Sequence, residues 1–252
     1  MNIDKLKEYW LSEEAVAHIH GWDFSHIHTR YEEEENLPWN YEEIIQSYLK
    51  DSHRLLDIDT GGGEFLLSLG HPHSKTSATE GYPPNVALCE KTLLPLGIDF
   101  RPMQDVNQMP FPDHHFDIII NRHGDYNVSE LYRVLKPGGI FITQQVGMEN
   151  DRELVELLLP DTPQPFPNAN LRFQTESFQK QGFQILRSEE AFPPIRFYDI
   201  GALVWFARII EWEFPAFSVE TCLKQLLKAQ DILEQHGSVD GTTHRYLIVA
   251  QK

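Results

Sequence analysis

Three successive glycines, residues 61–63, follow a short apolar stretch that ends in Asp57 and Ile58. Successive glycines permit positive φ angles and leave room for a ligand to contact the main chain. Leu66 and Leu67 then begin a helical pattern, and the first turn of a helix offers free N–H groups and the positive end of its dipole. Because such a turn lies at the carboxyl ends of the strands in an open α/β sheet, we expect a ligand site there.

Two acidic residues narrow the choice of ligand. Glu80 ends a second apolar run, where its carboxylate could accept hydrogen bonds from two ribose hydroxyls, and Asp105 follows a third run, where it could accept from an adenine amino group. Both the dinucleotide fingerprint G-x-G-x-x-G and the Walker phosphate loop are absent. Taken alone, each acid is equally well explained as a capping or turn residue, and so is Asp57. Their order along the chain favours a nucleoside site.

A third group of polar residues, Asn121, Arg122 and His123, follows the isoleucines at 118–120. His123 is the best candidate for a general base. A reaction at this site needs such a base only if the reacting nucleophile carries a proton of high pKa. A histidine satisfied within its own loop is the stronger alternative. Arg122 could pair with a substrate carboxylate or phosphate, and a structural salt bridge is an equal alternative.

These residues need a framework of strands and helices to hold them. Apolar runs predict strands at 54–58, 76–80, 98–103, 116–121, 140–146, 183–188 and 244–250. Helical patterns are found at 3–19, 41–49, 64–69, 85–94, 129–135, 199–213 and 219–233. Four prolines make 160–167 a loop. Strands that alternate with helices imply right-handed crossovers and a mostly parallel sheet.

The ordered motifs between residues 53 and 146 resemble those of a class I S-adenosylmethionine-dependent methyltransferase with a methyltransferase type 11-like domain. The resemblance implies a Rossmann-like α/β fold with seven strands, mostly parallel, in which 244–250 is the antiparallel last strand. We expect an N-terminal helical cap over 1–50, followed by the methyltransferase domain over 51–252. A lid-like helical insertion is expected at about 195–238.

The resemblance also implies S-adenosylmethionine as the cofactor and a role for each motif. The first motif would approach the methionyl portion, Glu80 the ribose and Asp105 the adenine, with Val106 beside the ring and Asn121 near the transferred methyl group. The complete set of expected cofactor-binding residues is Asp57, Asp59, Thr60, Gly61, Gly63, Glu80, Gly81, Asp105, Val106 and Asn121.

One residue departs from the family pattern, because Asp59 stands where the family usually has glycine. Its side chain could crowd the cofactor, or it could lean toward the α-ammonium group of the cofactor and add a charge-assisted attraction. We expect the cofactor to bind.

The expected reaction is an in-line displacement in which a nucleophile of the acceptor takes the methyl group of the sulfonium. The amine-modifying members of the family carry an (Asn/Asp)-Pro-Pro-Tyr motif after the fourth strand, and residues 121–124 do not match it, which disfavours that scheme. A small-molecule acceptor is expected. Aromatic residues near the N-terminus and in the insertion could form its pocket or simply be core. The candidate substrate residues are Trp22, Arg122 and Tyr198.

Composition limits the partners. The formal net charge of −17 and the lack of a Lys/Arg run argue against nucleic acid, and no apolar run approaches the roughly 20 residues that span a bilayer. Cys89 and Cys222 are expected to be buried free thiols, and the protein is expected to be cytoplasmic. The closely spaced histidines (18–28, 71–73, 114–115) lack accompanying cysteines, so we expect surface and loop histidines and no metal.

Three alternatives to a small-molecule methyltransferase stay open. One is an RNA methyltransferase, which a positive surface around the site would favour. Another is a non-catalytic S-adenosylmethionine-binding module, which is suggested by Asp59 at a position where the family usually has glycine. The last is a nicotinamide dehydrogenase, which shares the fold but fits the glycine spacing poorly.

Overall fold

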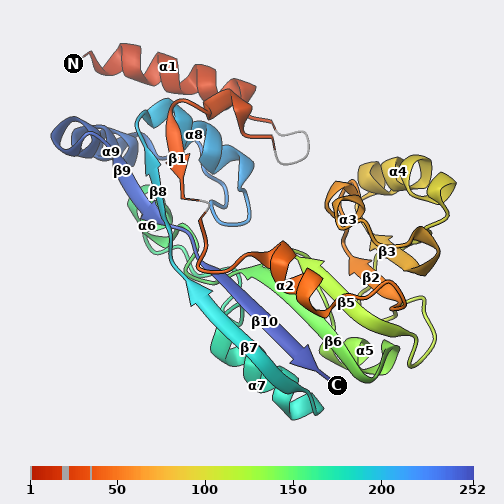
Figure 1. Cartoon of the computed structure of the whole chain (residues 1–252). Coiled ribbons are helices and arrows are strands. Elements are labelled where there is room, and N and C mark those ends of the chain that lie inside the picture. Colours follow the sequence, from red (N-terminus) through yellow and green to blue (C-terminus); the bar gives the residue numbers. More distant parts are fainter. Residues whose placement is uncertain (1, 19–22, 35) are drawn as a thin grey trace. The chain divides into compact units, whose positions relative to one another are not determined.

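The computed structural model describes residues 2–18, 23–34 and 36–252, and the chain divides into two compact units (Figure 1). The first, the helical unit, combines residues 1–37, 147–167 and 192–244. The second, the sheet unit, combines residues 38–146, 168–191 and 245–252. The expected boundary at residue 50 differs from this division, since 38–50 belongs with the sheet and 147–167 with the N-terminal segment.

The sheet unit is built on seven strands in the order β4-β3-β2-β5-β6-β10-β7. Five strands, β2 to β6, are parallel, and β10 runs antiparallel to both β6 and β7. The strands are β2 (Leu55–Ile58), β3 (Thr76–Glu80), β4 (Asp99–Pro102), β5 (Phe116–Arg122), β6 (Leu135–Val146), β7 (Gln184–Ala191) and β10 (Arg245–Gln251). The predicted seven-stranded, mostly parallel α/β sheet is thereby confirmed.

The central strands are continuous apolar or small-residue runs because helices cover both faces of a parallel sheet. All residues of β2 and β3 are buried. On one face, Leu131 and Val134 of α5 and Phe178 of α7 join the core formed by β2, β5, β6 and β10. The helices of this unit are α2 (Tyr41–Tyr48), α3 (Glu64–Ser68), α4 (Pro83–Thr92), α5 (Val128–Val134) and α7 (Leu171–Gln181), with 3-10 turns η2 (His73–Lys75) and η3 (Leu94–Leu96).

The helical unit contains a small antiparallel sheet in the order β1-β8-β9, which the sequence patterns did not predict. Its elements are α1 (Ile3–Val16), η1 (Ser25–Ile27), β1 (Tyr31–Glu33), α6 (Arg152–Leu158), β8 (Pro194–Phe197), α8 (Ile200–Ile209), α9 (Leu223–His236) and β9 (Val239–Thr242). The expected insertion at about 195–238 therefore holds strand β8 as well as two helices. Trp10, Phe197 and Trp205 lie in a core that belongs to this unit alone.

Candidate functional site

The glycine turn between β2 and α3 has the backbone conformation that its residue types suggest. Asp59, Gly61 and Gly63 all have positive φ, at 54°, 65° and 87°. The Thr60 N–H donates to the carbonyl of Thr79 on β3 over 3.0 Å, so the turn is held against the neighbouring strand. A Cβ at Gly63 would stand 2.8 Å from the Leu93 side chain, which leaves room for no residue but glycine.

Glu80, at the end of β3, ties the turn to the rest of the site. One carboxylate oxygen, Oε2, accepts from the Gly61 N–H over 2.8 Å. The other, Oε1, accepts from the N–H groups of Gly81 and Tyr82, each over 2.8 Å. The side chain is 6% exposed, which excludes a solvated surface acid, and a carboxylate has room for about four hydrogen bonds. Asn85 Nδ2 is a fourth donor, to Oε2 over 3.4 Å, so a ligand at this carboxylate would have to replace that long bond.

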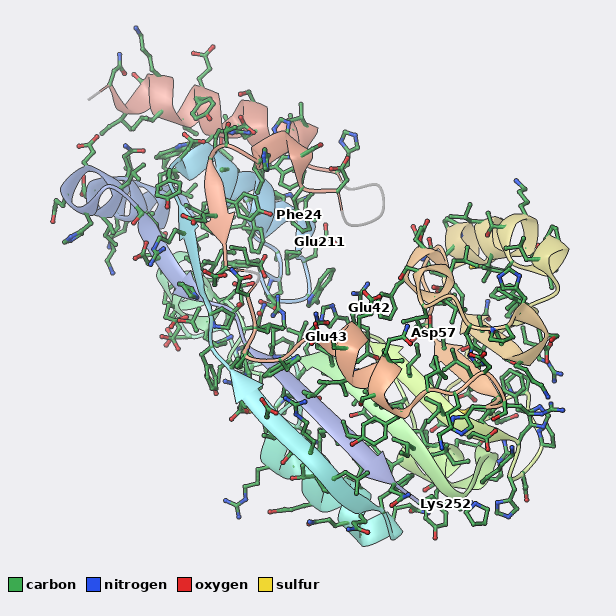
Figure 2. All side chains as sticks on the ribbon, viewed as in Figure 1. Phe24, Glu42, Glu43, Asp57, Glu211 and Lys252 are labelled. Carbon is green, nitrogen blue, oxygen red and sulfur yellow. The ribbon has the colours of Figure 1, made fainter. Side chains whose placement is uncertain are left out.

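Asp57, which is labelled in Figure 2, lies on β2. It is buried and accepts from the Thr60 hydroxyl over 2.6 Å. Burial raises the pKa of Asp57 to about 7, and the negative charges of Asp59 and Glu80 act in the same direction, whereas Thr60 and Arg122 oppose the rise. Its carboxyl is thus held between the neutral and charged states near neutral pH, and a cation placed nearby would favour the charged state.

The side chain of Asp59 lies beside the loop that follows β5. A Cβ built on Gly124 would lie 2.6 Å from Asp59 Cβ and 2.7 Å from Asp59 Oδ2, so the aspartate fills the space that Gly124 leaves. The carboxylate accepts a hydrogen bond from the Asp125 main chain. Burial, followed by the charge of Glu80, raises the pKa of Asp59 to about 6. This side chain therefore bridges the ends of β2 and β5.

Asn121 lies fully buried at the end of β5 with its amide engaged inside the protein. Its Nδ2 donates to the carbonyl of Ile58 over 3.1 Å, and its Oδ1 accepts from the Thr143 hydroxyl over 3.2 Å and from Gln145 Nε2. The residue thereby fixes β5 against β2 and β6. Any contribution that it makes to a cofactor site is positional.

Arg122 stacks on an aromatic pair. Its guanidinium lies 4.5 Å from the centre of the Phe65 ring, and Phe65 stacks on Tyr41 at 5.6 Å. The Tyr41 hydroxyl is anchored because it donates to the main-chain oxygen of Asn121 over 2.9 Å. Among the described residues, no carboxylate forms a salt bridge with Arg122. The alternative of a structural salt bridge thus gains no support from the described part of the chain.

His123 follows in the left-handed conformation, with φ of 62°. Its N–H donates to the Gln144 carbonyl over 2.9 Å. Desolvation and the positive charges of Arg245 and Arg122 lower the pKa of His123. The imidazole is therefore neutral at neutral pH, and its Nε2 lies 3.4 Å from Gln144 Nε2, a contact within the protein of the kind that the loop alternative describes.

The remaining candidate residues lie in different settings. Asp105 is exposed and accepts from the Asn107 N–H over 2.9 Å, an Asx turn of the kind its sequence alternative described. Val106 packs on the core of the sheet unit. Tyr198 belongs to the helical unit, where its hydroxyl donates to Glu32 over 2.6 Å. Trp22 lies outside the described residues.

Two residues near the glycine turn, Tyr82 and Cys89, were not predicted as part of the site. Tyr82 follows Glu80 by two positions and is 62% exposed at the start of α4. Cys89, also on α4, donates its thiol to the Gly61 carbonyl over 3.1 Å, and burial raises the pKa of that thiol to about 11. Both cysteines are buried and free, as predicted. His71 lies in a loop, as expected, but it is buried there.

Within residues 2–18, 23–34 and 36–252, no three His, Cys, Asp or Glu side chains are grouped so as to hold a metal ion. None of the helices in that described part is both long and apolar enough to cross a membrane.

Comparison with known proteins identifies the domain. Residues 56–143 match the family model of a methyltransferase domain. The ubiquinone/menaquinone biosynthesis C-methyltransferase of Cupriavidus necator is 29% identical over 113 residues, which is 40% of this chain and 46% of that protein. The phthiotriol/phenolphthiotriol dimycocerosates methyltransferase of Mycobacterium tuberculosis is 30% identical over 110 residues, which is 41% of this chain and 40% of that protein. The chain thus spans less than half the length of these curated relatives.

A solved structure from Bacillus halodurans, described as a candidate methyltransferase, has the same fold. It superposes with a TM-score of 0.57 at 17% identity and covers 84% of this chain and 98% of that one. The sheet order, the glycine turn and these matches define a methyltransferase domain. The predicted resemblance to the class I S-adenosylmethionine-dependent methyltransferases is thereby confirmed, with the family match spanning residues 56–143.

Proposed function

We propose that the protein transfers a methyl group from S-adenosylmethionine to a small-molecule acceptor. The observation that carries this proposal is the joined set of the glycine turn and the acid at the end of β3, in which the Gly61 N–H and the Glu80 carboxylate meet at 2.8 Å. Buried carboxylates at the carboxyl ends of parallel strands suit a nucleoside that carries positive charge.

Within this proposal each residue has a stated part. Glu80 would hold the ribose, Asp105 and Val106 the adenine, and Asp57, Asp59, Thr60, Gly61, Gly63 and Gly81 the remainder of the cofactor, with Asn121 fixing the ends of β2 and β5. When bound, the cofactor supplies an electrophilic methyl group. The protein then has to align the acceptor and exclude water, which can contribute on the order of 7–11 kcal/mol at best.

The relatives support a small acceptor, since their names describe quinone biosynthesis and methylation of phthiotriol and phenolphthiotriol dimycocerosates. Arg122 would contribute to acceptor binding, and the neutral imidazole of His123 is the candidate base. Because its pKa is lowered, His123 suits an acceptor whose own proton is already acidic.

Calorimetry with S-adenosylmethionine and S-adenosylhomocysteine tests the proposal directly. We expect one site per chain with micromolar affinity for both. A matched variant, Glu80→Gln, retains the size of the side chain but offers only one carbonyl oxygen, and it should bind at least tenfold more weakly. Absence of heat at millimolar ligand with the unmodified protein would exclude the proposed cofactor. Transfer of a tritiated methyl group into a small-molecule extract would then identify the acceptor.

A further inference from the structure

Asp59 occupies a position where the resembled family usually has glycine. The backbone angles and the space beside Gly124 accommodate its side chain. The backbone there has φ of 54°, a left-handed conformation that aspartate tolerates better than most other non-glycine residues. Its side chain is directed into the space beside Gly124, where any Cβ would lie within 2.7 Å of the Asp59 carboxylate. The missing side chain at 124 and the added side chain at 59 thus complement each other.

The surroundings of Asp59 hold more negative than positive charge. Asp57 on β2, Glu80 on β3 and Asp125 after β5 are the carboxyl groups nearby, and Arg122 on β5 is the charged base. Arg122 acts on Asp57, but no described residue forms a salt bridge with Asp57, Asp59 or Glu80. No group of the described residues is arranged as a metal site. The negative charge of these carboxyl groups is therefore not balanced by the described residues, and a cationic ligand would balance it.

The three carboxylates differ in how far the protein already satisfies them. Glu80 accepts three main-chain N–H groups and Asp57 accepts the Thr60 hydroxyl over 2.6 Å. Asp59 accepts one main-chain N–H, that of Asp125. Since a carboxylate can take about four hydrogen bonds, Asp59 retains acceptor capacity beside the glycine turn.

We propose that the Asp59 carboxylate is a cofactor-binding group that pairs with the α-ammonium of the bound cofactor. This inference rests on the proposed function. The pairing would give the turn an ionic contact that a glycine at position 59 cannot make. The raised pKa of Asp59 is consistent with it, because an apposed cation favours the charged carboxylate and so expels any proton that the free protein carries.

The test compares two ligands on three forms of the full chain. S-adenosylhomocysteine carries the α-ammonium group, and 5′-methylthioadenosine has the nucleoside and the sulfur without it. Titration calorimetry is run on the unmodified protein, on Asp59→Asn, which removes the charge but keeps an oxygen acceptor for Asp125, and on Asp59→Gly, which restores the family residue. Thermal melting shows that each variant is folded.

We expect both variants to bind S-adenosylhomocysteine roughly tenfold more weakly, while the affinity for methylthioadenosine stays within about twofold. Titrations near pH 6 in buffers of different ionisation enthalpy should show proton release for the unmodified protein and less for Asp59→Asn, in which Asp57 still titrates.

Two results would overturn the inference while leaving the proposed function intact. In the first, Asp59→Asn binds S-adenosylhomocysteine as tightly as the unmodified protein. In the second, both ligands weaken equally, which means that Asp59 only shapes the turn. If the unmodified protein binds neither ligand, the proposed function itself fails.

Discussion

At the scale of single residues, the site combines a special backbone conformation with a charge that the free protein disfavours. Asp59 and His123 both have positive φ, at 54° and 62°, and they flank the place where β2 and β5 end. A buried carboxyl with no cation partner costs stability in its charged form. Sites that bind charged ligands often retain such a cost, because the ligand later offsets it.

This cost predicts how stability depends on pH in the free protein. The pKa of Asp59 is raised from 3.8 to about 6 in the folded state, so the native state binds a proton more tightly than the unfolded chain. The free energy of unfolding therefore falls as pH rises from about 4 to about 6, and the loss is complete above pH 6. Asp59→Asn should be more stable than the unmodified protein by about 1–2 kcal/mol at pH 7.5 and equal to it near pH 4.

Urea unfolding at the two pH values measures this difference. Asp51→Asn is the matched control, since it removes the same formal charge from an exposed position in the sheet unit and should change stability by less than about 0.5 kcal/mol. Equal behaviour of the two variants at pH 7.5 would show that overall charge, and not the setting of Asp59, governs the effect.

At the scale of elements, the glycine turn should tolerate a side chain at Gly62 better than one at Gly63. Gly63 has φ of 87° and faces Leu93 of the segment after α4 at 2.8 Å from a built Cβ, whereas a Cβ at Gly62 would meet only the far end of the flexible Glu64 side chain. Gly63→Ala should therefore cost about 1–3 kcal/mol and displace the start of α3.

Denaturant titration and S-adenosylhomocysteine calorimetry check this prediction together. Gly62→Ala is the control, because Gly62 has no positive φ and the Glu64 carboxyl can rotate away. We expect the unfolding equilibrium constant of Gly62→Ala and its dissociation constant for S-adenosylhomocysteine to stay within about twofold of those of the unmodified protein. A Gly63→Ala protein as stable as Gly62→Ala would show that the turn is not constrained by Leu93.

Most strands of the large sheet could be predicted because central parallel strands leave a continuous apolar run. The isoleucines at 118–120 are one example, and all three are buried in β5. The small sheet could not be predicted for the opposite reason. Strand β1 contains Tyr31, Glu32 and Glu33, has no apolar alternation, and pairs with Phe197, Arg196 and Ile195 far along the chain.

The candidate site shows the same division between local and distant information. The positions of Asp57, the glycines and Glu80 at neighbouring strand ends follow from the order of strands and turns. The pairing of Asp59 with Gly124 and the stack of Arg122 on Phe65 depend on backbone angles and on residues that lie tens of positions apart in the sequence. The spacing of apolar residues along the sequence does not predict such contacts. The binding roles of these residues stay predictions.

At the scale of the whole molecule, each unit has a hydrophobic core among its described residues, and these two cores share no residue. One, around Trp205, Phe197 and Trp10, belongs to the helical unit, and the other, around Phe141, Phe178 and Ile119, belongs to the sheet unit. Separate cores favour separate opening reactions, since each unit can lose its own packing while the other retains its packing.

Hydrogen exchange with and without S-adenosylhomocysteine tests whether the two units open separately. A ligand that binds only the folded sheet unit stabilises it by about 2.7 kcal/mol at one hundred times the dissociation constant, so the slowest amides of β2, β3 and β5 should exchange up to about a hundredfold more slowly. Amides of α8 in the helical unit should change little. The Asp59→Asn variant at the same ligand concentration should show less protection in the sheet unit, which ties the effect to cofactor binding. Equal slowing in α8 and in β2 would mean that the chain opens as one cooperative unit despite its two cores.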